Sequence, residues 1–230
     1  MTDLTRFNSY HGAPAGAPVD PGWRRTVEPQ GPIESPVSDA EFASFLEDPC
    51  PPGDNTTEQI LRRTWLQAAT QQVVDYLDRE ILQRDVIVRF DAYPRAHSSR
   101  GQLVRIHGGH EFFMTLPRMP IATFDRVETV DDEGVTAEIA AEDYDLDDVS
   151  EPARLHLHDP PARGELDYFA GIRVYYTAGY EADKVPEALR LGVLMLAGYL
   201  YEHRGMQGDG ALRKSGAASI LAPWRIRIGL

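Results

Sequence analysis

Four histidines are the side chains best suited to metal binding in this 230-residue sequence. They lie in the stretches HGGHE and HLHD, as His107, His110, His156 and His158. Because side chains alternate along a strand, the two histidines of HLHD would share one face, and all four could be assembled as ligands. No HExxH motif and no paired CxxC accompanies them. A metal-binding protein or small enzyme is therefore one hypothesis, whereas the HGG stretch equally suits a strand that runs into a turn.

The acidic run EDYDLDD at 142–148 places aspartates in alternation, which is one feature of calcium-binding loops. An EF-hand loop also needs glycine at its sixth position and glutamate at its twelfth. With Asp143 as the first position, those two positions hold Asp148 and Arg154. The run is therefore interpreted as a solvent-exposed edge strand.

Nucleophilic and nucleotide chemistry have little support in the sequence. Cys50, the single cysteine, is flanked by prolines in DPCPPGD, cannot form an internal disulfide and has no identified general base. The motifs GxSxG, GxxxxGK[ST] and GxGxxG are absent from the chain. A nucleophile-elbow hydrolase, a P-loop NTPase and a simple Rossmann fold therefore lack their usual support in the sequence.

A cluster at the end of a helix also has reactive types of side chain. The apolar helix in VPEALRLGVLMLAGYLYEHRG ends on Tyr201, Glu202, His203 and Arg204. Basic residues in a last turn interact favourably with the free carbonyls and the helix dipole, and Gly205 can close the helix. The cluster is therefore interpreted as a helix terminus.

The composition is that of an acidic globular protein. The chain is 42% hydrophobic and 26% charged, with a formal net charge of −13. Its longest apolar stretch, at 189–200, is shorter than the ~18 residues that a membrane span needs, and its first residues lack the features of a secretory signal. We expect no membrane, assembly in a reducing cytoplasm, and no tight DNA binding, because such binding needs Lys and Arg to neutralise phosphates.

The first part of the chain reads as an arm followed by two helices. Residues 1–36 contain six prolines, show no helical or strand period, and are expected to form an extended or disordered lead. Ser38 then caps a short amphipathic helix at 39–47. A long helix of about seven turns is predicted at 57–82, with Thr56 and Gln59 as its capping box.

Apolar residues in the long helix recur every three or four positions, so one face should be buried and the opposite face should be charged. Trp65 is expected to fill the core. The predicted buried stripe is Leu61, Trp65, Ala68 or Ala69, Val73, Leu77 and Ile81, and the predicted charged face is Arg62, Arg63, Asp75 and Arg79.

From residue 86 onward, apolar residues recur at every second position instead of at helical spacing. Seven runs rich in β-branched and aromatic residues follow, and DDEG at 131–134 indicates a hairpin in which Gly134 adopts positive φ. The sequence thus predicts an α+β fold with a helical core (short helix, long helix, C-terminal helix), a β-rich insertion at about 86–177 and extended N- and C-terminal arms. The expected divisions are an arm at 1–36, a main domain at 37–222 and a tail at 223–230.

The stretch at 171–204, GIRVYYTAGYEADKVPEALRLGVLMLAGYLYEHR, contains a strand that ends in AGY, a short loop, VP, and an apolar helix that ends in YEHR. This order resembles the head–tail connector proteins of long-tailed bacteriophages, of the adaptor or head-completion type, whose helix ends in YExRE or a close variant. The positions taken as the family signature, and as ring-packing residues, are Ala178, Gly179, Tyr180, Pro186, Tyr201, Glu202 and Arg204.

The resemblance extends over about 38–230. LPRMPIATFDRVETVDDEG at 116–134 is similar to the family's LP-x-x-P stretch with its strand and hairpin, and 144–146 is similar to its Y-x-L segment. The two N-terminal helices and ILAPWRIRIGL resemble the family's opening helices and its closing LL-x-P-[YF]-R. Two features depart from the family: DPPARGELDYFAG replaces its Trp-Pro, and the proline-rich lead is not general.

The resemblance implies a structural role in the virion neck, with no catalytic residue, no cofactor and no enzymatic activity. Such adaptors form a ring, typically of twelve subunits, beneath the portal, extend the DNA channel and provide a platform for stopper or tail proteins. The implied partners are other copies of the chain, the portal protein, a stopper or tail-completion protein, and double-stranded DNA that passes without sequence-specific binding. The structural alternative is a stopper or tail-completion protein itself, a class that is usually smaller and β-barrel-like.

The C-terminal tail WRIRIGL alternates apolar and basic residues. An extended tail of this kind could add to a partner's sheet or groove, with its arginines meeting acidic groups, or it could be an edge strand of the protein's own sheet. Deleting from residue 223 onward is expected to abolish portal attachment and to leave the subunit folded. The residues expected to dock on the portal are Pro223, Trp224, Arg225, Ile226, Arg227 and Ile228.

Overall fold

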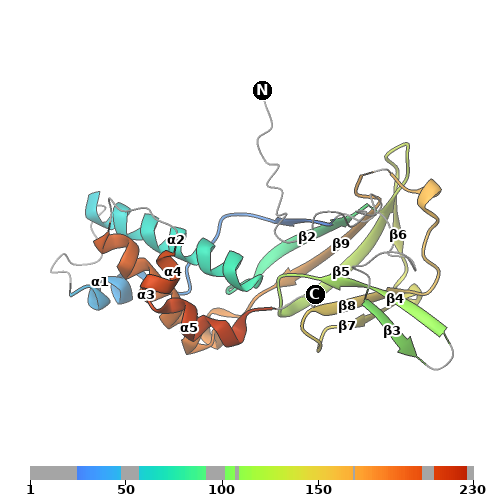
Figure 1. Cartoon of the computed structure of the whole chain (residues 1–230). Coiled ribbons are helices and arrows are strands. Elements are labelled where there is room, and N and C mark those ends of the chain that lie inside the picture. Colours follow the sequence, from blue (N-terminus) through green and yellow to red (C-terminus); the bar gives the residue numbers. More distant parts are fainter. Residues whose placement is uncertain are drawn as a thin grey trace, which may run out of the picture.

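The computed structural model describes residues 25–47, 57–91, 102–106, 109–167, 169–203 and 210–226. Two lobes lie next to each other along the molecule, one made of helices and the other of two β-sheets (Figure 1). Each lobe has its own hydrophobic core. The predicted α+β class, with helices on both sides of a β-rich region in the sequence, is confirmed. No helix within the described ranges is long and apolar enough to cross a membrane.

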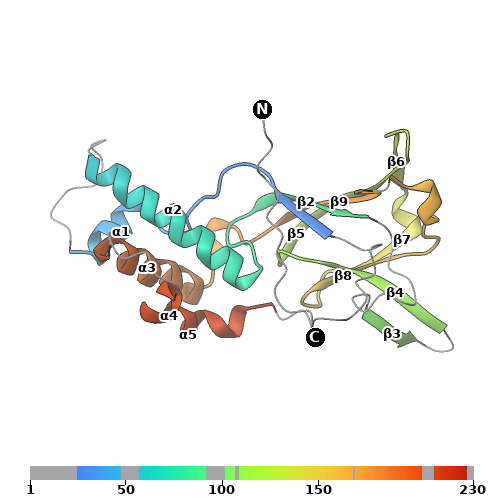
Figure 2. The ribbon, with the colours of Figure 1, turned by 45° about the horizontal axis from the view of Figure 1, so that its top comes forward.

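The helical lobe consists of α1 (Asp39–Phe45), α2 (Thr57–Leu77), α3 (Glu187–Glu202), α4 (Ala211–Lys214) and α5 (Ala217–Leu221). Helix α3 lies between α2 and α5 and packs against both (Figure 2). The core of the helical lobe is built mainly from α2 and α3, whose buried residues recur at three- and four-residue spacing. The short helices α4 and α5 lie in a stretch for which the sequence predicted no helix.

The ends of two helices follow the sequence prediction. The hydroxyl of Ser38 accepts a hydrogen bond from the Glu41 amide at 3.2 Å, and the Glu41 carboxylate accepts one from the Ser38 amide at 2.8 Å. This reciprocal capping box satisfies two amides that the first turn of α1 leaves without helical partners. Pro186 precedes α3 as its N-cap residue. Thr56, the expected cap of α2, is not among the described residues.

Helix α2 is shorter than predicted. It ends at Leu77, because Asp78 adopts a left-handed backbone conformation with φ of +53°. The prediction that the helix continues to residue 82 is therefore wrong. The apolar period that continues through Ile81 reflects a turn packed in the same core, and Ile81 is 1% exposed there.

The buried face of α2 also differs from the predicted stripe. Arg62 is 0% exposed and Arg79, just beyond the helix, is 2% exposed, although both were assigned to the charged face. Leu61 and Trp65 are half-buried and lie at the flank of the packed face. Ala69, Val73 and Leu77 are buried as predicted. The rest of the buried face is formed by Gln59, Arg62, Leu66, Thr70 and Val74.

The larger sheet has five antiparallel strands in the spatial order β1 (Arg25–Pro29), β2 (Arg84–Phe90), β9 (Ile172–Ala178), β5 (Ile121–Val130) and β6 (Thr136–Ile139). The smaller sheet has the order β3 (Gln102–Ile106), β4 (Gly109–Leu116), β8 (Ala153–Leu157) and β7 (Tyr144–Asp147). Single turns of 3₁₀ helix are η1 (Ala141–Asp143), η2 (Arg163–Glu165), η3 (Ala182–Lys184) and η4 (Ala222–Trp224).

Alternation of side chains explains why the two sheets pack face to face. In β9 every second residue from Ile172 to Ala178 is buried, and β8 shows the same pattern from Ala153 to Leu157. The buried residues of both sheets form one continuous core. The predicted β-rich region is thus a two-layer sandwich inserted between α2 and α3.

Two local predictions in the β lobe are confirmed. Gly134 has a φ of +80° in the turn between β5 and β6, where the Asp131 carboxylate accepts hydrogen bonds from the amides of Glu133 and Val135. The acidic run at 142–148 contains β7, which is an edge strand of the smaller sheet.

Part of the N-terminal segment belongs to the folded body. Residues 25–29 form β1 and pair with β2, with Val27 opposite Val88. The prediction that residues 1–36 lack strand structure is therefore wrong for these five residues. The two-residue alternation of a strand is not visible in the sequence of these residues, because β1 is a short edge strand in which only Val27 is a strongly apolar strand former.

Candidate functional site

Sequence motifs that lie far apart in the chain meet where the two lobes join. The end of α2 contacts the LPRMP segment at 116–120, the turn after β9 and the residues around η4. Arg79 pairs with Met119, and Leu82 pairs with Tyr180, as isolated β-bridges. We call this region the junction. Its main residues are Arg79, Arg118, Tyr176, Gly179, Tyr180 and Ile226.

Arg79 connects four parts of the junction. Its Nε donates to the Trp224 carbonyl at 3.1 Å, and one terminal nitrogen donates to the Tyr180 hydroxyl at 3.3 Å. The other terminal nitrogen donates to the Glu151 carboxylate at 2.5 Å. Because the planar guanidinium holds its donors in a fixed geometry, this buried side chain sets the distance and angle between the segments it joins.

Arg118 closes the C-terminal end of α2. Its guanidinium donates to the Val74 carbonyl and to the Asp75 carboxylate, both at 3.1 Å. Its backbone amide also donates to the Asp78 carbonyl at 3.1 Å. A cation next to the last carbonyls of a helix is favourable, because those carbonyls lack helical partners and carry partial negative charge. The LPRMP motif therefore acts as a cap supplied from the other lobe.

The same motif is tied to β9. The Tyr176 hydroxyl donates to the Pro117 carbonyl at 2.6 Å, and the Gly179 amide donates to the Pro120 carbonyl at 2.8 Å. Tyr176 is 1% exposed, and its burial raises the pKa of the phenol well above the usual range. The hydroxyl therefore stays protonated at neutral pH and can donate this hydrogen bond.

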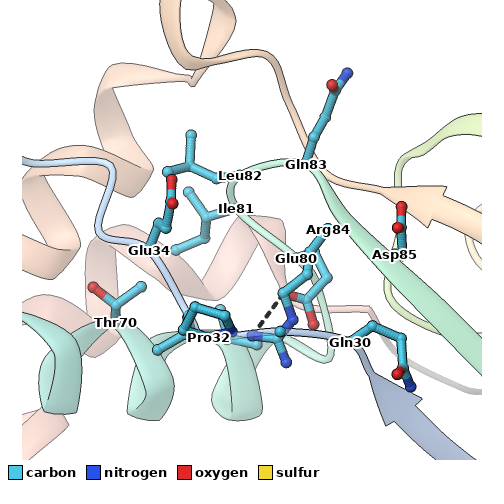
Figure 3. Close-up of a pocket in the computed structure, with 13 residues that line it drawn as sticks. Gln30, Pro32, Glu34, Thr70, Glu80, Ile81, Leu82, Gln83, Arg84 and Asp85 are labelled. Atoms are coloured by element: carbon cyan, nitrogen blue, oxygen red, sulfur yellow. Dashed lines mark ion pairs between the residues drawn. The ribbon is translucent and has the colours of Figure 1, made fainter.

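A pocket of about 290 Å³ opens at the junction (Figure 3). Residues 30–34 and 80–85 line it together with Thr70 and Val74 of α2. Glu80 is 1% exposed, and burial raises the pKa of its carboxyl. Arg84 at 4.0 Å and Arg118 at 3.8 Å are the neighbouring cations, and both distances exceed a direct hydrogen bond.

The chemistry available at the junction is structural. Its arginines, of which Arg79 is buried and Arg118 is half-buried, are held by carbonyls, a hydroxyl and carboxylates of the chain itself. In the part of the chain whose side chains are described, no group of three or more His, Cys, Asp or Glu is placed to hold a metal ion. What this arrangement does is to keep the two lobes in one relative orientation.

The structure brings two of the four candidate histidines together. His156 and His158 lie on one face of the smaller sheet with ring centroids 5.8 Å apart, as alternation predicted. The Nε2 atom of His158 lies 2.9 Å from the Asp145 carboxylate, and this hydrogen bond raises the pKa of the imidazole. Residue His107 and the side chain of His110 are outside the described part, so the four-ligand hypothesis is not tested.

The acidic run uses one of its aspartates to fix a loop. The Asp147 carboxylate accepts hydrogen bonds from the Ser150 amide at 3.0 Å and from the Arg154 Nε at 2.9 Å. Hydrogen bonds from Ser150 and Arg154 lower the pKa of Asp147 to about 2. The loop between β7 and β8 also contains Glu151, so this clamp positions the carboxylate that binds Arg79.

Replacing Asp147 with asparagine should remove part of the acid sensitivity of the fold. The folded pKa of Asp147 lies below its usual value of 3.8, so its stabilisation is present above pH 4 and is lost as the pH falls from about 4 to about 2. The variant should be less stable than the wild type at pH 6, and the difference should shrink toward pH 2 in urea unfolding. Asp132→Asn, in the exposed β5–β6 turn, is the control and should show no such difference at pH 6.

The signature residues make contacts inside the subunit wherever they are described. Ala178 is in the core of the β lobe, and Gly179 and Tyr180 form the turn at the junction. Tyr201 donates a hydrogen bond to Glu58 and packs edge-on against Phe42. Glu202 is exposed, whereas Arg204 is not among the described residues, so their assignment to ring packing is not tested.

The first half of the expected docking tail is also part of the folded body. Ile226 is 7% exposed in the core of the β lobe, and its amide donates to the Leu77 carbonyl at 3.0 Å. Arg225 lies over the Tyr76 ring at 5.1 Å, and Pro223 is exposed at η4. Deletion from Pro223 would thus remove core contacts, so the expectation that it leaves the subunit folded is revised. Arg227 and Ile228 are beyond the described range.

Sequence reasoning missed the buried ionic residues of the molecule. Arg62 pairs with Asp39 at 3.2 Å between α2 and α1, while Arg79 and Arg118 hold the junction. A charged residue within a run of helical apolar spacing can lie at either an exposed or a buried position. For Arg62, its helical spacing from Gln59, Leu66 and Ala69 was the signal that could have predicted burial.

No family model matches the sequence, and a comparison with curated proteins finds no match. Solved structures give a clear result. A chain from the neck of an empty gene transfer agent (GTA) particle, computed with C6 symmetry, matches with a TM-score of 0.69 and 21% identity, over 89% of this chain and 97% of that chain. This protein has the fold of a GTA neck protein.

Two further structures share this fold. A chain in the virion of a native GTA particle gives a TM-score of 0.63 at 21% identity, over 89% of this chain and 97% of that one. A chain in the neck of a native GTA particle, computed with C12 symmetry, gives 0.55 at 19% identity, over 87% and 96%. The match to the GTA neck fold therefore includes both lobes and the junction between them.

Proposed function

We propose that this protein is a structural component of the neck of a phage-like virion, where it acts as a head–tail adaptor without catalytic activity. The observation that carries the proposal is the shared fold with a neck chain over nearly the whole length of both molecules. The order of motifs at 116–134 and 171–204 supports the proposal independently, because it resembles the connector family. These two stretches contact each other at the junction.

In this role, copies of the chain form a ring beneath the portal, extend the DNA channel and give the stopper or tail a platform. Twelve subunits are proposed, in agreement with the C6 and C12 symmetries of the similar neck structures. Subunits are made in the host cytoplasm and reside in the virion neck. The long helices α2 and α3 favour the adaptor over a smaller, β-barrel-like stopper protein.

Attachment to the portal is assigned to the end of the C-terminal tail. Because Ile226 is buried in the β lobe, the docking segment is narrowed to residues 227–230. The residues from Pro223 to Ile226 then anchor the segment to the body. Arg227 and Ile228 retain the alternation of basic and apolar side chains that suits addition to a partner's groove.

A variant that ends at Ile226 tests this assignment. It should keep the thermal midpoint of the wild type, because the buried contacts of Ile226 remain, and it should bind the portal at least about tenfold more weakly. Native mass measurement of the chain mixed with its portal provides the readout. Arg63→Ala, which removes one positive charge from the exposed surface of α2, is the control and should bind the portal normally. Wild-type binding by the truncated chain would contradict the docking role, and an image of the particle neck without this subunit would contradict the adaptor role.

A further inference from the structure

One end of the β lobe is strongly acidic. Residues 131–143 contain six Asp and Glu and no Lys, Arg or His. This stretch runs from the β5–β6 turn through β6 to η1. Among the described residues, no salt bridge involves four of its exposed members, which are Asp132, Glu133, Glu142 and Asp143. We call this surface the acidic end.

The C-terminal part of the helical lobe has the opposite charge. Residues 210–226 contain Arg213, Lys214 and Arg225 and no Asp or Glu. All three side chains are exposed, the first two at the end of α4 and the third just after η4. Within the described ranges none of them makes an ion pair, and Arg225 has only the ring of Tyr76 beneath it. We call this surface the basic end.

The two surfaces cannot neutralise each other within one subunit. Helices α4 and α5 belong to the helical lobe, whereas β6 lies at the far end of the β lobe (Figures 1 and 2). Charges separated by more than about 10 Å in water are largely screened at 0.1 M salt. Each subunit therefore presents two unlike, complementary surfaces on opposite sides of the molecule.

We propose that copies of this chain associate head to tail, with the acidic end of one subunit against the basic end of the next. This inference rests on the proposed ring and names the contact that closes it. Contact between unlike surfaces is heterologous, and such contacts generate a closed ring when the rotation between subunits closes. Val135, which is 59% exposed within the acidic end, contributes apolar surface that this contact buries.

A second copy suits the basic end better than DNA does. Only three basic residues are present there, on a chain whose formal net charge is −13. DNA binding gains its affinity from each phosphate that is neutralised, so three cations on an acidic protein supply little of it. A complementary acidic surface of another copy, in contrast, gains specificity and association rate from the same charges.

Charge reversal at each end provides the test, with association measured by analytical ultracentrifugation from about 0.05 to about 0.5 M salt. Wild-type association should weaken as salt increases. Arg213→Glu/Lys214→Glu should weaken association about tenfold or more, and Asp132→Lys/Glu133→Lys should do the same. An equimolar mixture of the two variants should associate again, because each reversed end then meets an end of opposite charge.

A matched control changes the net charge equally at other surfaces. Arg63→Glu/Lys184→Glu alters exposed residues of α2 and η3 and should associate like the wild type. The proposal is overturned if the wild type stays monomeric at every salt concentration, if the reversals have no effect, or if the mixture does not recover. It is also overturned if Arg213→Glu/Lys214→Glu loses binding to a fluorescent DNA duplex that the wild type binds, because the basic end would then contact DNA.

The outcomes separate this contact from the adaptor role. If the chain binds the portal and does not associate through these ends, the adaptor proposal stands and the head-to-tail contact is wrong. If the chain associates head to tail and the portal does not bind it, the contact stands and the adaptor role fails.

Discussion

Replacing Gly179 with alanine should destabilise the protein by at least about 4 kcal/mol, enough to leave a large fraction unfolded. Gly179 has a φ of +111°, and an added Cβ would lie 2.3 Å from the Leu82 carbonyl oxygen and 2.8 Å from the Gln83 amide nitrogen. Both neighbours are backbone atoms, so they cannot rotate away as a flexible side chain can. The turn would have to open, and with it the bonds from Gly179 to Pro120 and from Tyr180 to Ile81.

Gly134→Ala is the matched control for Gly179→Ala. Gly134 also has a positive φ, +80°, but an added Cβ there would meet nothing within 4 Å. Its substitution should cost only the backbone strain of a left-handed alanine, about 1–2 kcal/mol. Urea unfolding of both variants measures the difference. Equal losses of stability would show that close packing at the junction contributes nothing beyond the backbone conformation.

Replacing Arg79 with methionine should cost about 2–4 kcal/mol of unfolding free energy. Methionine keeps much of the volume of the side chain, so the loss reports on hydrogen bonds more than on a cavity. The Trp224 carbonyl and the Tyr180 hydroxyl, which belong to half-buried residues, would each lose a donor. We also expect faster amide hydrogen exchange at Ile226, because its partner Leu77 lies two residues before Arg79.

Arg89→Met is the control for Arg79→Met. Arg89 binds Glu28 at 2.8 Å, a distance similar to that between Arg79 and Glu151, but its side chain is 30% exposed on the outer face of the larger sheet. An exposed ion pair contributes little, so this substitution should change stability by no more than about 1 kcal/mol. If the two arginines proved equally dispensable, the junction would not depend on a buried arginine.

These two variants bear on the proposed role. A ring subunit that transmits the position of one partner to another must hold its two lobes in one orientation. The junction does so with a capped helix end, a buried guanidinium and a glycine turn, each supplied by a different part of the chain. Its residues come from the motifs that resemble the connector family, so the resemblance has a structural explanation within a single subunit.

Most secondary structure could be predicted, because local periodicity and caps determine it. Alternation in IRVYYT and ARLHLH required strands with one buried face, and both strands have it. Ser38 with Glu41 fixed the start of α1 through hydrogen bonds only three residues apart in sequence. The end of α2 was missed because the apolar period continues past it, whereas Asp78 breaks the helix through its backbone conformation.

Part of the candidate site was visible in the sequence and part was not. The AGY turn and the LP-x-x-P stretch could be recognised as motifs, but the hydrogen bond between Tyr176 and Pro117 joins residues 59 positions apart. The roles of Arg62 and Arg79 were assigned to the surface, because an arginine in a helix is usually exposed. Only their partners, Asp39 and Glu151, make burial favourable, and those partners come from other elements.

By itself, the sequence determined the α+β class, the capped start of α1, the positions of most strands along the chain and the order of motifs that resembles the connector family. These depend on interactions between residues that are close in the chain, which periodicity and capping record directly. The tertiary structure alone decided where α2 ends, which arginines are buried, that Ile226 belongs to the core, and that the charged ends lie on opposite sides. Each of these depends on contacts between distant segments, and their energies are set by burial, which local patterns in the sequence do not specify.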